Sequence, residues 1–233
     1  MKYKAIRQER LYLKVSEQLS AHIDSGSVAP GERLPSERDL AEQFGVSRPT
    51  IREAMIALEL AGRVEIRSGS GVYVRDLGKT ETAALPDDAP GPLELLEARY
   101  YIESDAAALA AERAGDAEIE AMEQAFQAMK LENRTPDSQE EADERFHMLI
   151  AKASGNSALH AAIQQLWQIR RTSAMSVFFH DKLRERGIKP IIRDHRAILD
   201  AIRKRDGDAA RKTMQKHLQD VLDAIVSEDE TAA

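Results

Sequence analysis

A proline- and glycine-rich segment divides the chain into two parts of different character. Residues 75–92, RDLGKTETAALPDDAPGP, hold three prolines and two glycines. This composition is typical of turns and linkers, because proline lacks a backbone donor and glycine leaves the backbone free to bend. We therefore predict domains at residues 1–76 and 92–233, joined by a linker at residues 77–91.

The first part has helical apolar spacing that gives way to a hairpin pattern. Apolar residues three to four apart predict a helix over residues 11–25. A short helix follows the natural N-cap Ser36 and stops at Gly45, and a third helix begins at Ser47. Two β-prone stretches, VEIR and VYV, then flank the turn SGSG. The order helix, helix, turn, helix, hairpin predicts a winged helix-turn-helix.

The start of the third helix is the candidate surface for DNA. Ser47, Arg48, Thr50 and Arg52 offer guanidinium forks for guanine or phosphate and short hydroxyls for phosphate. The glycine-rich hairpin turn has little side-chain bulk, so it can approach a backbone or a narrow minor groove closely. The alternative is a plain three-helix core with a charged helix facing solvent.

The sequence PGERLPSERDLAEQFGVSRPTIREAMIALELAGRVEIRSGSGVYV resembles the GntR family of bacterial regulators across its whole winged-helix domain. The resemblance implies that operator DNA is the partner. It assigns contacts with operator bases or phosphates to Arg38, Arg48 and Arg52, contacts with the DNA backbone to Ser47 and Thr50, and the leading position of the wing to Gly69.

The second part has the pattern of helices throughout. Apolar periodicity predicts helices over residues 93–113, 116–132, 138–153, 157–179, 188–204 and 207–227. The predicted fold is mostly α, with the winged helix-turn-helix followed by an antiparallel all-helical bundle. The formal charge is +1 for residues 1–77 and −8 for the remainder, which indicates different electrostatic roles for the two parts.

Four residues of the second part form a candidate metal site. Asp143 and His147 stand four apart in the helix EEADERFHMLIA, so both project from one face. His195 and His217 lie in two later predicted helices. One carboxylate and three imidazoles from three helices suit Zn²⁺, Ni²⁺ or Mn²⁺. For each residue taken alone, a solvated or packed side chain is the simpler interpretation, and His180 in particular is interpreted as an ordinary surface or core residue.

The segments LLEARYYIES, DERFHMLIAKASGNSAL and DHRAILDAI, with the final helix around His217, resemble the effector domain called FCD in the FadR subgroup of GntR regulators. The resemblance covers about residues 92–227. It implies a divalent metal held by Asp143, His147, His195 and His217, with zinc favoured over nickel or manganese. It also implies a small carboxylate effector, which the remaining positive charge of the ion would attract.

Four further side chains are candidate effector contacts. Arg99, by its position in the family, would point toward the effector carboxylate, and its alternative is an ion pair with an acid such as Glu103. For Asn156, in the helix-starting segment SGNSAL, an N-cap is the favoured role and an effector contact is the alternative. The stretches GRVEIRSGSGVYV, GPLELLEARYYIES and QLWQIR look similar to regulators of hexuronate utilisation. A hexuronate is therefore the favoured effector, with Trp167 and Arg170 as pocket residues, and lactate, pyruvate and other organic acids stay open.

Composition excludes several classes of protein. The chain contains no cysteine, which removes disulfides, thiolate catalysis and cysteine-based zinc fingers. It has no run of about 18 apolar residues and no apolar core of a signal peptide at its N-terminus. We expect a cytoplasmic protein without a membrane span.

Together these features predict a dimeric, metabolite-responsive transcription regulator, with a repressor favoured. Two recognition helices of a homodimer would bind palindromic double-stranded operator DNA. One alternative is a metal-dependent enzyme that activates water against a sugar acid. The other is a regulator whose metal is purely structural. We favour the non-enzymatic interpretation and assign no catalytic residue.

Overall fold

The computed structural model describes residues 10–67, 69–76, 85, 89–135 and 140–227. Two compact units are present, and the boundary between them lies between Pro92 and Leu93. The last residues of the predicted linker therefore belong with the first unit. Within the described ranges, no helix is both long and apolar enough to cross a membrane.

The N-terminal unit contains three helices packed around α3. These are α1 (Leu11–Asp24), α2 (Glu37–Phe44) and α3 (Arg48–Leu60), and both α1 and α2 contact α3. The inner face of α3 is fully buried at Ile51, Met55 and Leu58, because these residues follow the helical repeat.

The wing is an antiparallel hairpin with a third segment added to it. Strands β1 (Val64–Arg67) and β2 (Gly71–Val74) pair as the sequence predicts, with Val64 opposite Val74. The N–H of Leu34 also donates to the carbonyl of Val72 at 2.8 Å, and Arg33 bridges Tyr73. Sequence analysis missed this pairing because the segment PGERL shows no alternation of apolar and polar residues. Ser68 of the predicted hairpin tip lies outside the described residues.

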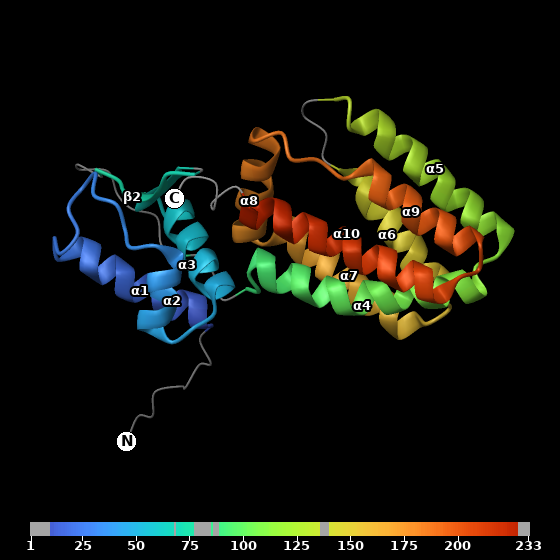
Figure 1. Ribbon diagram of the computed structural model, residues 1–233, viewed down its shortest axis with the longest axis horizontal. Helices are drawn as coiled ribbons and strands as arrows, with labels where there is room; N and C mark the ends of the chain where they lie inside the picture. Colours follow the sequence, from blue (N-terminus) through green and yellow to red (C-terminus); the bar gives the residue numbers. More distant parts are fainter. Residues whose placement is uncertain (1–9, 68, 77–84, 86–88, 136–139, 228–233) are drawn as a thin grey trace, which may run out of the picture. The chain divides into compact units, whose positions relative to one another are not determined.

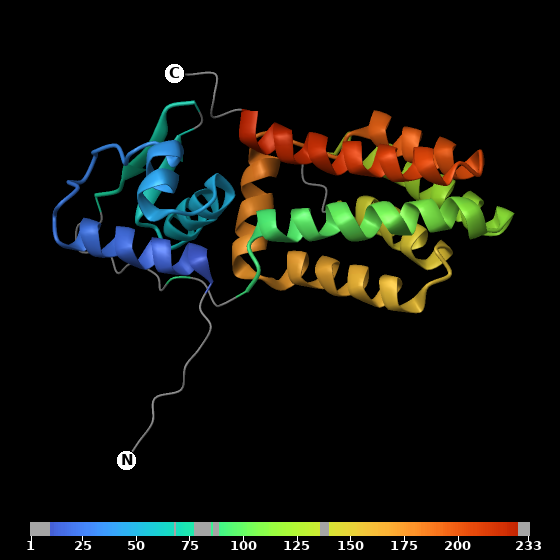
Figure 2. The same cartoon turned by 60° about the horizontal axis from the view of Figure 1, so that its bottom comes forward.

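The C-terminal unit is entirely helical in its described part (Figures 1 and 2). Its elements are α4 (Pro92–Arg113), α5 (Asp116–Glu132), α6 (Glu141–Ala153), α7 (Ser157–Thr172), α8 (Ala174–Glu185), α9 (Ile192–Arg203) and α10 (Gly207–Ser227). Helix α5 packs on α6 and α9, and α7 packs on α6 and α8. In the view of Figure 2, helix α4 runs with α10 above it and α7 below it, and its Asp105 pairs with Arg211 of α10 at 2.8 Å.

Two predicted helix boundaries are wrong. The helix predicted over residues 157–179 is broken at Ser173, whose φ of −68° and ψ of 125° are extended. The break carries neither glycine nor proline; the hydroxyl of Thr172 donates to the carbonyl of Gln168 at 2.8 Å, a local bond that competes with helix continuation. Helix α9 begins at Ile192 rather than at residue 188, because Pro190 disfavours helix before it. Residues 138 and 139 of the predicted third helix lie outside the described residues.

Candidate nucleic-acid interface and metal centre

Two caps and one glycine shape the turn between α2 and α3. The hydroxyl of Ser36 accepts a hydrogen bond from the N–H of Asp39 at 3.2 Å. The hydroxyl of Ser47 accepts one from the N–H of Thr50 at 3.3 Å. Between them Gly45 has a φ of 66°, the left-handed conformation that glycine adopts without strain. These local interactions orient the start of α3.

Two of the expected operator-binding arginines are exposed. The Arg38 side chain is 82% exposed, and Arg48, the first residue of α3, is also exposed. Ser47 is exposed beside them, and its hydroxyl lies 2.8 Å from that of Thr50. This arrangement can present guanidinium groups and hydroxyls to base edges and phosphates.

Arg52 occupies a different environment. Its side chain is only 8% exposed. Its Nε and one terminal nitrogen donate to the two carboxylate oxygens of Glu37 at 2.9 and 2.8 Å. In this arrangement Arg52 fastens α2 to α3.

The wing carries two arginines around its glycines. Gly69 has a φ of 65° in the turn. The guanidinium of Arg67 lies 4.4 Å from the ring centroid of Tyr73. A Cβ on Gly71 would lie 2.4 Å from Nε of Arg33, so that the guanidinium of Arg33 can cross this position only because it is glycine. Arg33 was not found from the sequence because its segment was not recognised as part of the wing.

The end of the predicted linker is held against the N-terminal unit. The hydroxyl of Tyr12 on α1 donates to the carbonyl of Ala89 at 2.9 Å. A Cβ on Gly91 would lie 2.1 Å from a carboxylate oxygen of Glu53 on α3. The chain therefore leaves this unit along a path fixed by α1 and α3.

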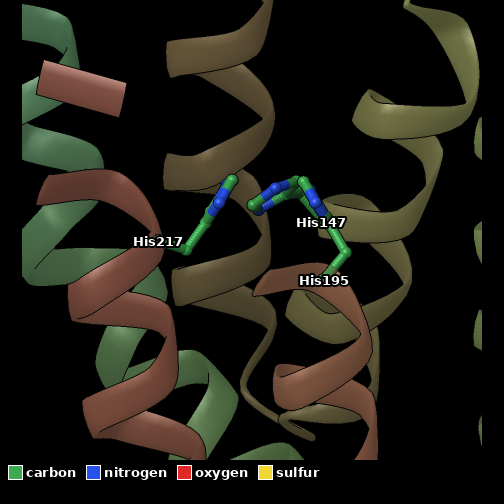
Figure 3. A group of neighbouring side chains, drawn as sticks. All are labelled: His147, His195 and His217. Carbon is green, nitrogen blue, oxygen red and sulfur yellow. The ribbon is translucent and has the colours of Figure 1, made fainter. Parts of the chain in front are cut away.

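Three histidines from three helices converge in the C-terminal unit (Figure 3). His147 on α6, His195 on α9 and His217 on α10 are buried, and their candidate ligand atoms all lie within 4.8 Å of one another. An oxygen of Asp143 lies 2.8 Å from Nε2 of His195 and 3.9 Å from Nε2 of His147. The structure thus brings together all four residues of the predicted metal site.

The outer nitrogens of two of these histidines are fixed by the protein. Nδ1 of His147 lies 2.5 Å from a carboxylate oxygen of Glu103. Nδ1 of His195 lies 2.9 Å from the carbonyl oxygen of Ile191. Metal-binding histidines commonly donate their second N–H to a carboxylate or a carbonyl, which sets the ring orientation. Both rings are therefore held with Nε2 available to the centre of the cluster.

Two nitrogens of the cluster have no hydrogen-bond partner. Among the described residues, Nε2 of His147 and Nδ1 of His217 are buried and accept no hydrogen bond, while Nε2 of His195 lies 2.8 Å from Asp143. Each buried polar atom without a partner costs about 1–3 kcal/mol, and a cation within the cluster would interact with imidazole and carboxylate together. Three imidazole nitrogens and one carboxylate oxygen suit a borderline divalent ion such as zinc. The residues present therefore fit the metal that the resemblance implies.

The protonation states of the cluster also suit a metal. Burial alone would raise the pKa of Asp143, but His195 and His147 outweigh it and hold this pKa well below its usual range. Burial, together with the neighbouring His195 and His147, lowers the pKa of His217. An ionised carboxylate and a neutral imidazole are the forms that bind metal ions.

Glu103 connects the histidines to the rest of the domain. Its buried carboxylate accepts hydrogen bonds from Nε of Arg99 at 2.7 Å and from the indole N–H of Trp167 at 3.0 Å. Burial would raise the pKa of Glu103, but the charges of Arg99 and His147 outweigh it and lower this pKa. The ion pair expected as the alternative role of Arg99 is present, and it lies directly behind a candidate metal ligand.

Trp167 separates two arginines. Its side chain is fully buried, with the guanidinium of Arg99 4.1 Å and that of Arg170 4.8 Å from its ring centroid. Arg170 pairs with Glu140 at 2.6 Å and donates from Nε to Nε2 of His180 at 3.1 Å. Arg170 also lines a cleft of about 530 Å³ formed by residues of α6, α7 and α8. Trp167 thus positions charged groups instead of offering a polar atom to a ligand.

Asn156 is an N-cap. Its amide oxygen accepts hydrogen bonds from the N–H groups of Ala158 and Leu159 at 3.0 and 3.2 Å. The residue is exposed at the start of α7. Its side-chain oxygen is already used, so the expected effector contact has no support in this geometry.

Two family models together match most of the chain. Residues 11–74 match the model described as "Bacterial regulatory proteins, gntR family", and residues 94–220 match that of the FCD domain. The chain is 38% identical over 229 residues to the Uxu operon transcriptional regulator of Escherichia coli K12, covering 95% of this chain and 89% of that protein. This chain belongs to the GntR family of bacterial regulatory proteins.

Two further relatives of this GntR protein are informative. It is 33% identical over 223 residues to the Exu regulon transcriptional regulator of E. coli K12, covering 94% of this chain and 86% of that protein. It is 34% identical over 237 residues to the putative L-lactate dehydrogenase operon regulatory protein of E. coli K12, covering 96% of this chain and 90% of that protein.

Membership of the family settles the class of function. The protein is a transcriptional regulator and not an enzyme, so the metalloenzyme alternative is set aside. GntR regulators bind operator DNA, and FCD domains bind small-molecule effectors. The predicted fold class of this GntR protein is confirmed as well.

Part of the surroundings of the candidate metal site in the FCD domain could not be predicted from the sequence. Glu103 entered only as an ion-pair partner of Arg99, although the spacing of four residues on one helix already placed it on the same face. The partnership of His180 with Arg170 gave no signal in the sequence, because it depends on how α8 turns after the break at Ser173.

Proposed function

We propose that this GntR protein represses a catabolic operon and is released from its operator when a hexuronate or a related sugar acid binds beside a metal ion in the FCD domain. The observation that carries the proposal is the buried cluster of Asp143, His147, His195 and His217, with orphaned nitrogens aimed at its centre. Similarity to the Uxu and Exu regulators supports the choice of effector. We assign the protein to the FadR subgroup on the resemblance of its effector domain.

Zinc is the ion that we assign to the cluster, with nickel and manganese as alternatives. His147 and His195 would hold it through Nε2, since Glu103 and the Ile191 carbonyl engage their other nitrogens. When bound, the ion supplies positive charge and open coordination positions that attract a carboxylate.

Arg99 is the residue that we expect to orient the effector carboxylate. Its Nε is used by Glu103 at 2.7 Å, while one terminal nitrogen makes only a long contact of 3.5 Å with the same carboxylate. A guanidinium anchored on one edge can present its other edge to an anion in a fixed direction. Arg99 would then bind the effector while Glu103 holds both Arg99 and His147 in place.

The winged helix would contact the operator through the residues grouped around the start of α3. We assign Arg38 and Arg48 to bases or phosphates, and Ser47, Thr50 and Gly69 to the DNA backbone. Arg52 is assigned to positioning through Glu37. A homodimer would place two recognition helices about 34–36 Å apart, which matches a palindromic operator.

Effector binding would act through the packing of the helices that carry the metal ligands. These ligands come from α6, α9 and α10, so that a carboxylate drawn into the cluster favours one arrangement of all three helices. A coupling free energy of about 1–3 kcal/mol would change operator affinity by roughly 5- to 150-fold. The backbone at Ala89 and Gly91 is held against the N-terminal unit. A rearrangement of the FCD helices would be transmitted to this unit through that segment.

A second candidate function is a regulator whose metal only stabilises the FCD domain. The near-complete burial of the three histidines favours it, because structural metal sites are closed. Under this alternative, removal of the metal lowers the melting temperature, but no organic acid binds to the loaded domain.

Thermal unfolding of the zinc-loaded protein separates these candidates. D-glucuronate, D-galacturonate, L-lactate and pyruvate are each added to the wild type, to His195→Ala and to the control His160→Ala, which changes a histidine outside the cluster. A ligand at 100 times its Kd stabilises by about 2.7 kcal/mol, or about 5–10 °C at this chain length. We expect that rise with a hexuronate in the wild type and control only. No rise with any acid would reject the sensor and favour the structural metal.

A further inference from the structure

The FCD domain contains a polar cleft of about 530 Å³ lined by residues of α6, α7 and α8, among them Arg170 and His180, and by Glu140, the N-cap residue of α6. We propose that this cleft binds the uncharged, hydroxyl-bearing chain of a sugar acid whose carboxylate lies at the metal cluster, and that it thereby selects long hydroxy acids over short ones. The inference rests on the proposed function, since it needs a carboxylate held at the cluster.

The cleft lies beside the metal ligands on α6. Each residue of an α-helix turns the side-chain direction by about 100°. Asp143 and His147 form one stripe of α6, and Glu144 and Met148 form the neighbouring stripe. The second stripe lines the cleft. One helix therefore presents metal ligands on one face and cleft residues on the adjacent face.

Helix α7 makes the same connection through Trp167. The ring of Trp167 lies 5.4 Å from that of His147, centroid to centroid. Arg170, one turn later on α7, stacks on the same indole and lines the cleft. Arg170 in the cleft wall and His147 in the cluster are therefore separated by one indole ring, and a ligand of several carbon atoms is long enough to span that separation.

The lining of the cleft suits hydroxyl groups. Four arginines and four acidic residues line it, so their formal charges balance. A second carboxylate would gain little net attraction there, and an apolar chain would find only Met148 and Val177 among mainly charged groups. A hydroxyl both donates and accepts, so it can bind guanidinium and carboxylate groups together.

The polar side chains of Glu140, Arg170 and His180 are fixed in the cleft wall by one another. Glu140 and Arg170 each expose only 14% of their side chains. Burial, followed by the charge of Arg170, lowers the pKa of His180 well below its usual value. The neutral ring accepts the hydrogen bond of Arg170 at Nε2, which leaves the N–H of Nδ1 as a donor. A buried ion pair adds little net stability. Stability therefore does not account for these charged groups of the cleft wall, whereas recognition of a ligand does.

The test compares acids of different length on the full-length, zinc-loaded protein by calorimetry. The ligands are D-glucuronate, L-lactate and glycolate, with D-glucarate as a six-carbon acid that carries a second carboxylate. The variant is Glu140→Gln/Arg170→Gln, which removes both charges together and leaves neither one buried alone. The matched control is Glu123→Gln/Arg196→Gln, an ion pair of 3.0 Å between α5 and α9 that does not line the cleft.

We expect the variant to raise the Kd of glucuronate at least tenfold. Its zinc content should stay unchanged, and its Kd values for lactate and glycolate should stay within twofold of the wild type. The control variant should change none of these quantities. If only glucuronate binds the wild type, its tenfold loss with zinc retained supports the inference. Glucarate should bind the wild type at least tenfold more weakly than glucuronate. The inference would be overturned, and the proposed function left intact, if the variant lost affinity equally for long and short acids, lost zinc, or lost no affinity at all. If no acid binds the wild type, the proposed function itself fails.

Discussion

Arg38 in the winged helix exposes 82% of its side chain, whereas Arg99 and Arg170 in the FCD domain expose 9% and 14% and are each paired with a glutamate. The first environment keeps a charge in water, where it can meet a phosphate at little desolvation cost and is screened by salt. The second fixes a guanidinium in one direction within a largely buried site. Under the proposed function, the same side chain would serve electrostatic attraction in one domain and geometric recognition in the other.

This difference implies that substitutions can abolish metal and effector binding or operator binding separately. Residues that touch the metal should affect zinc and effector binding without changing the affinity for operator in the absence of effector. Residues at the start of α3 should do the opposite.

Removal of a metal ligand is expected to have the largest effect. His195→Ala deletes one of three imidazoles that converge in a dry site, so stoichiometric zinc should be lost on dialysis. Operator affinity without effector should stay within twofold of the wild type. Mass spectrometry of bound zinc and fluorescence anisotropy with operator DNA check both statements, and full zinc retention would contradict the assigned site.

Removal of a recognition arginine is the reciprocal change. Arg48→Ala should weaken operator binding by about 1–3 kcal/mol, or roughly 5- to 150-fold, if Arg48 contacts a base. Zinc content should not change. Lys14→Ala, which removes an exposed cation from α1, is the control, and an equal loss in that variant would point to general electrostatic attraction.

Glu103→Gln tests the residue behind the metal ligand. Replacing a carboxylate that orients a ligating histidine typically costs about 10- to 100-fold in metal affinity. Zinc competition with a chelator measures this, and Glu112→Gln changes an exposed acid of the same helix as a control. If the melting temperature of the metal-free protein falls but zinc affinity does not, Glu103 is only structural.

Asn156→Ala is expected to have the smallest effect. Loss of this N-cap should reduce the free energy of unfolding by about 1 kcal/mol, as measured by urea titration. The affinity for glucuronate should stay within twofold, because the amide oxygen of Asn156 already accepts two hydrogen bonds at the start of α7. A tenfold loss of glucuronate affinity would restore Asn156 as an effector contact.

The two domains also differ in how far the sequence predicts them. Ser36, Gly45 and Ser47 act within a few residues of themselves, so that their caps and turn could be predicted from local pattern. The residues of the candidate metal cluster could be named from helical spacing and the FCD resemblance together. In contrast, the bond from Glu103 to His147 joins residues 44 apart in the chain, and such partners follow from tertiary packing that local pattern does not contain.

The same reason explains what could not be predicted. The sequence assigns Arg52 to operator DNA, but it does not show that the fork of Arg52 is matched by Glu37 from the preceding helix. The break at Ser173 carries no glycine or proline, yet it turns α8 so that His180 meets Arg170. Both features need knowledge of which helices lie together.

The central claim is that a sugar acid at the metal cluster controls operator binding. It is tested most directly by operator anisotropy with zinc-loaded protein during titration with D-glucuronate, in the wild type and in His195→Ala. The account predicts a 5- to 150-fold rise in operator Kd for the wild type and no change for the variant. An unchanged operator Kd across D-glucuronate and D-galacturonate at concentrations that saturate the wild type, or an equal rise in both proteins, would contradict it.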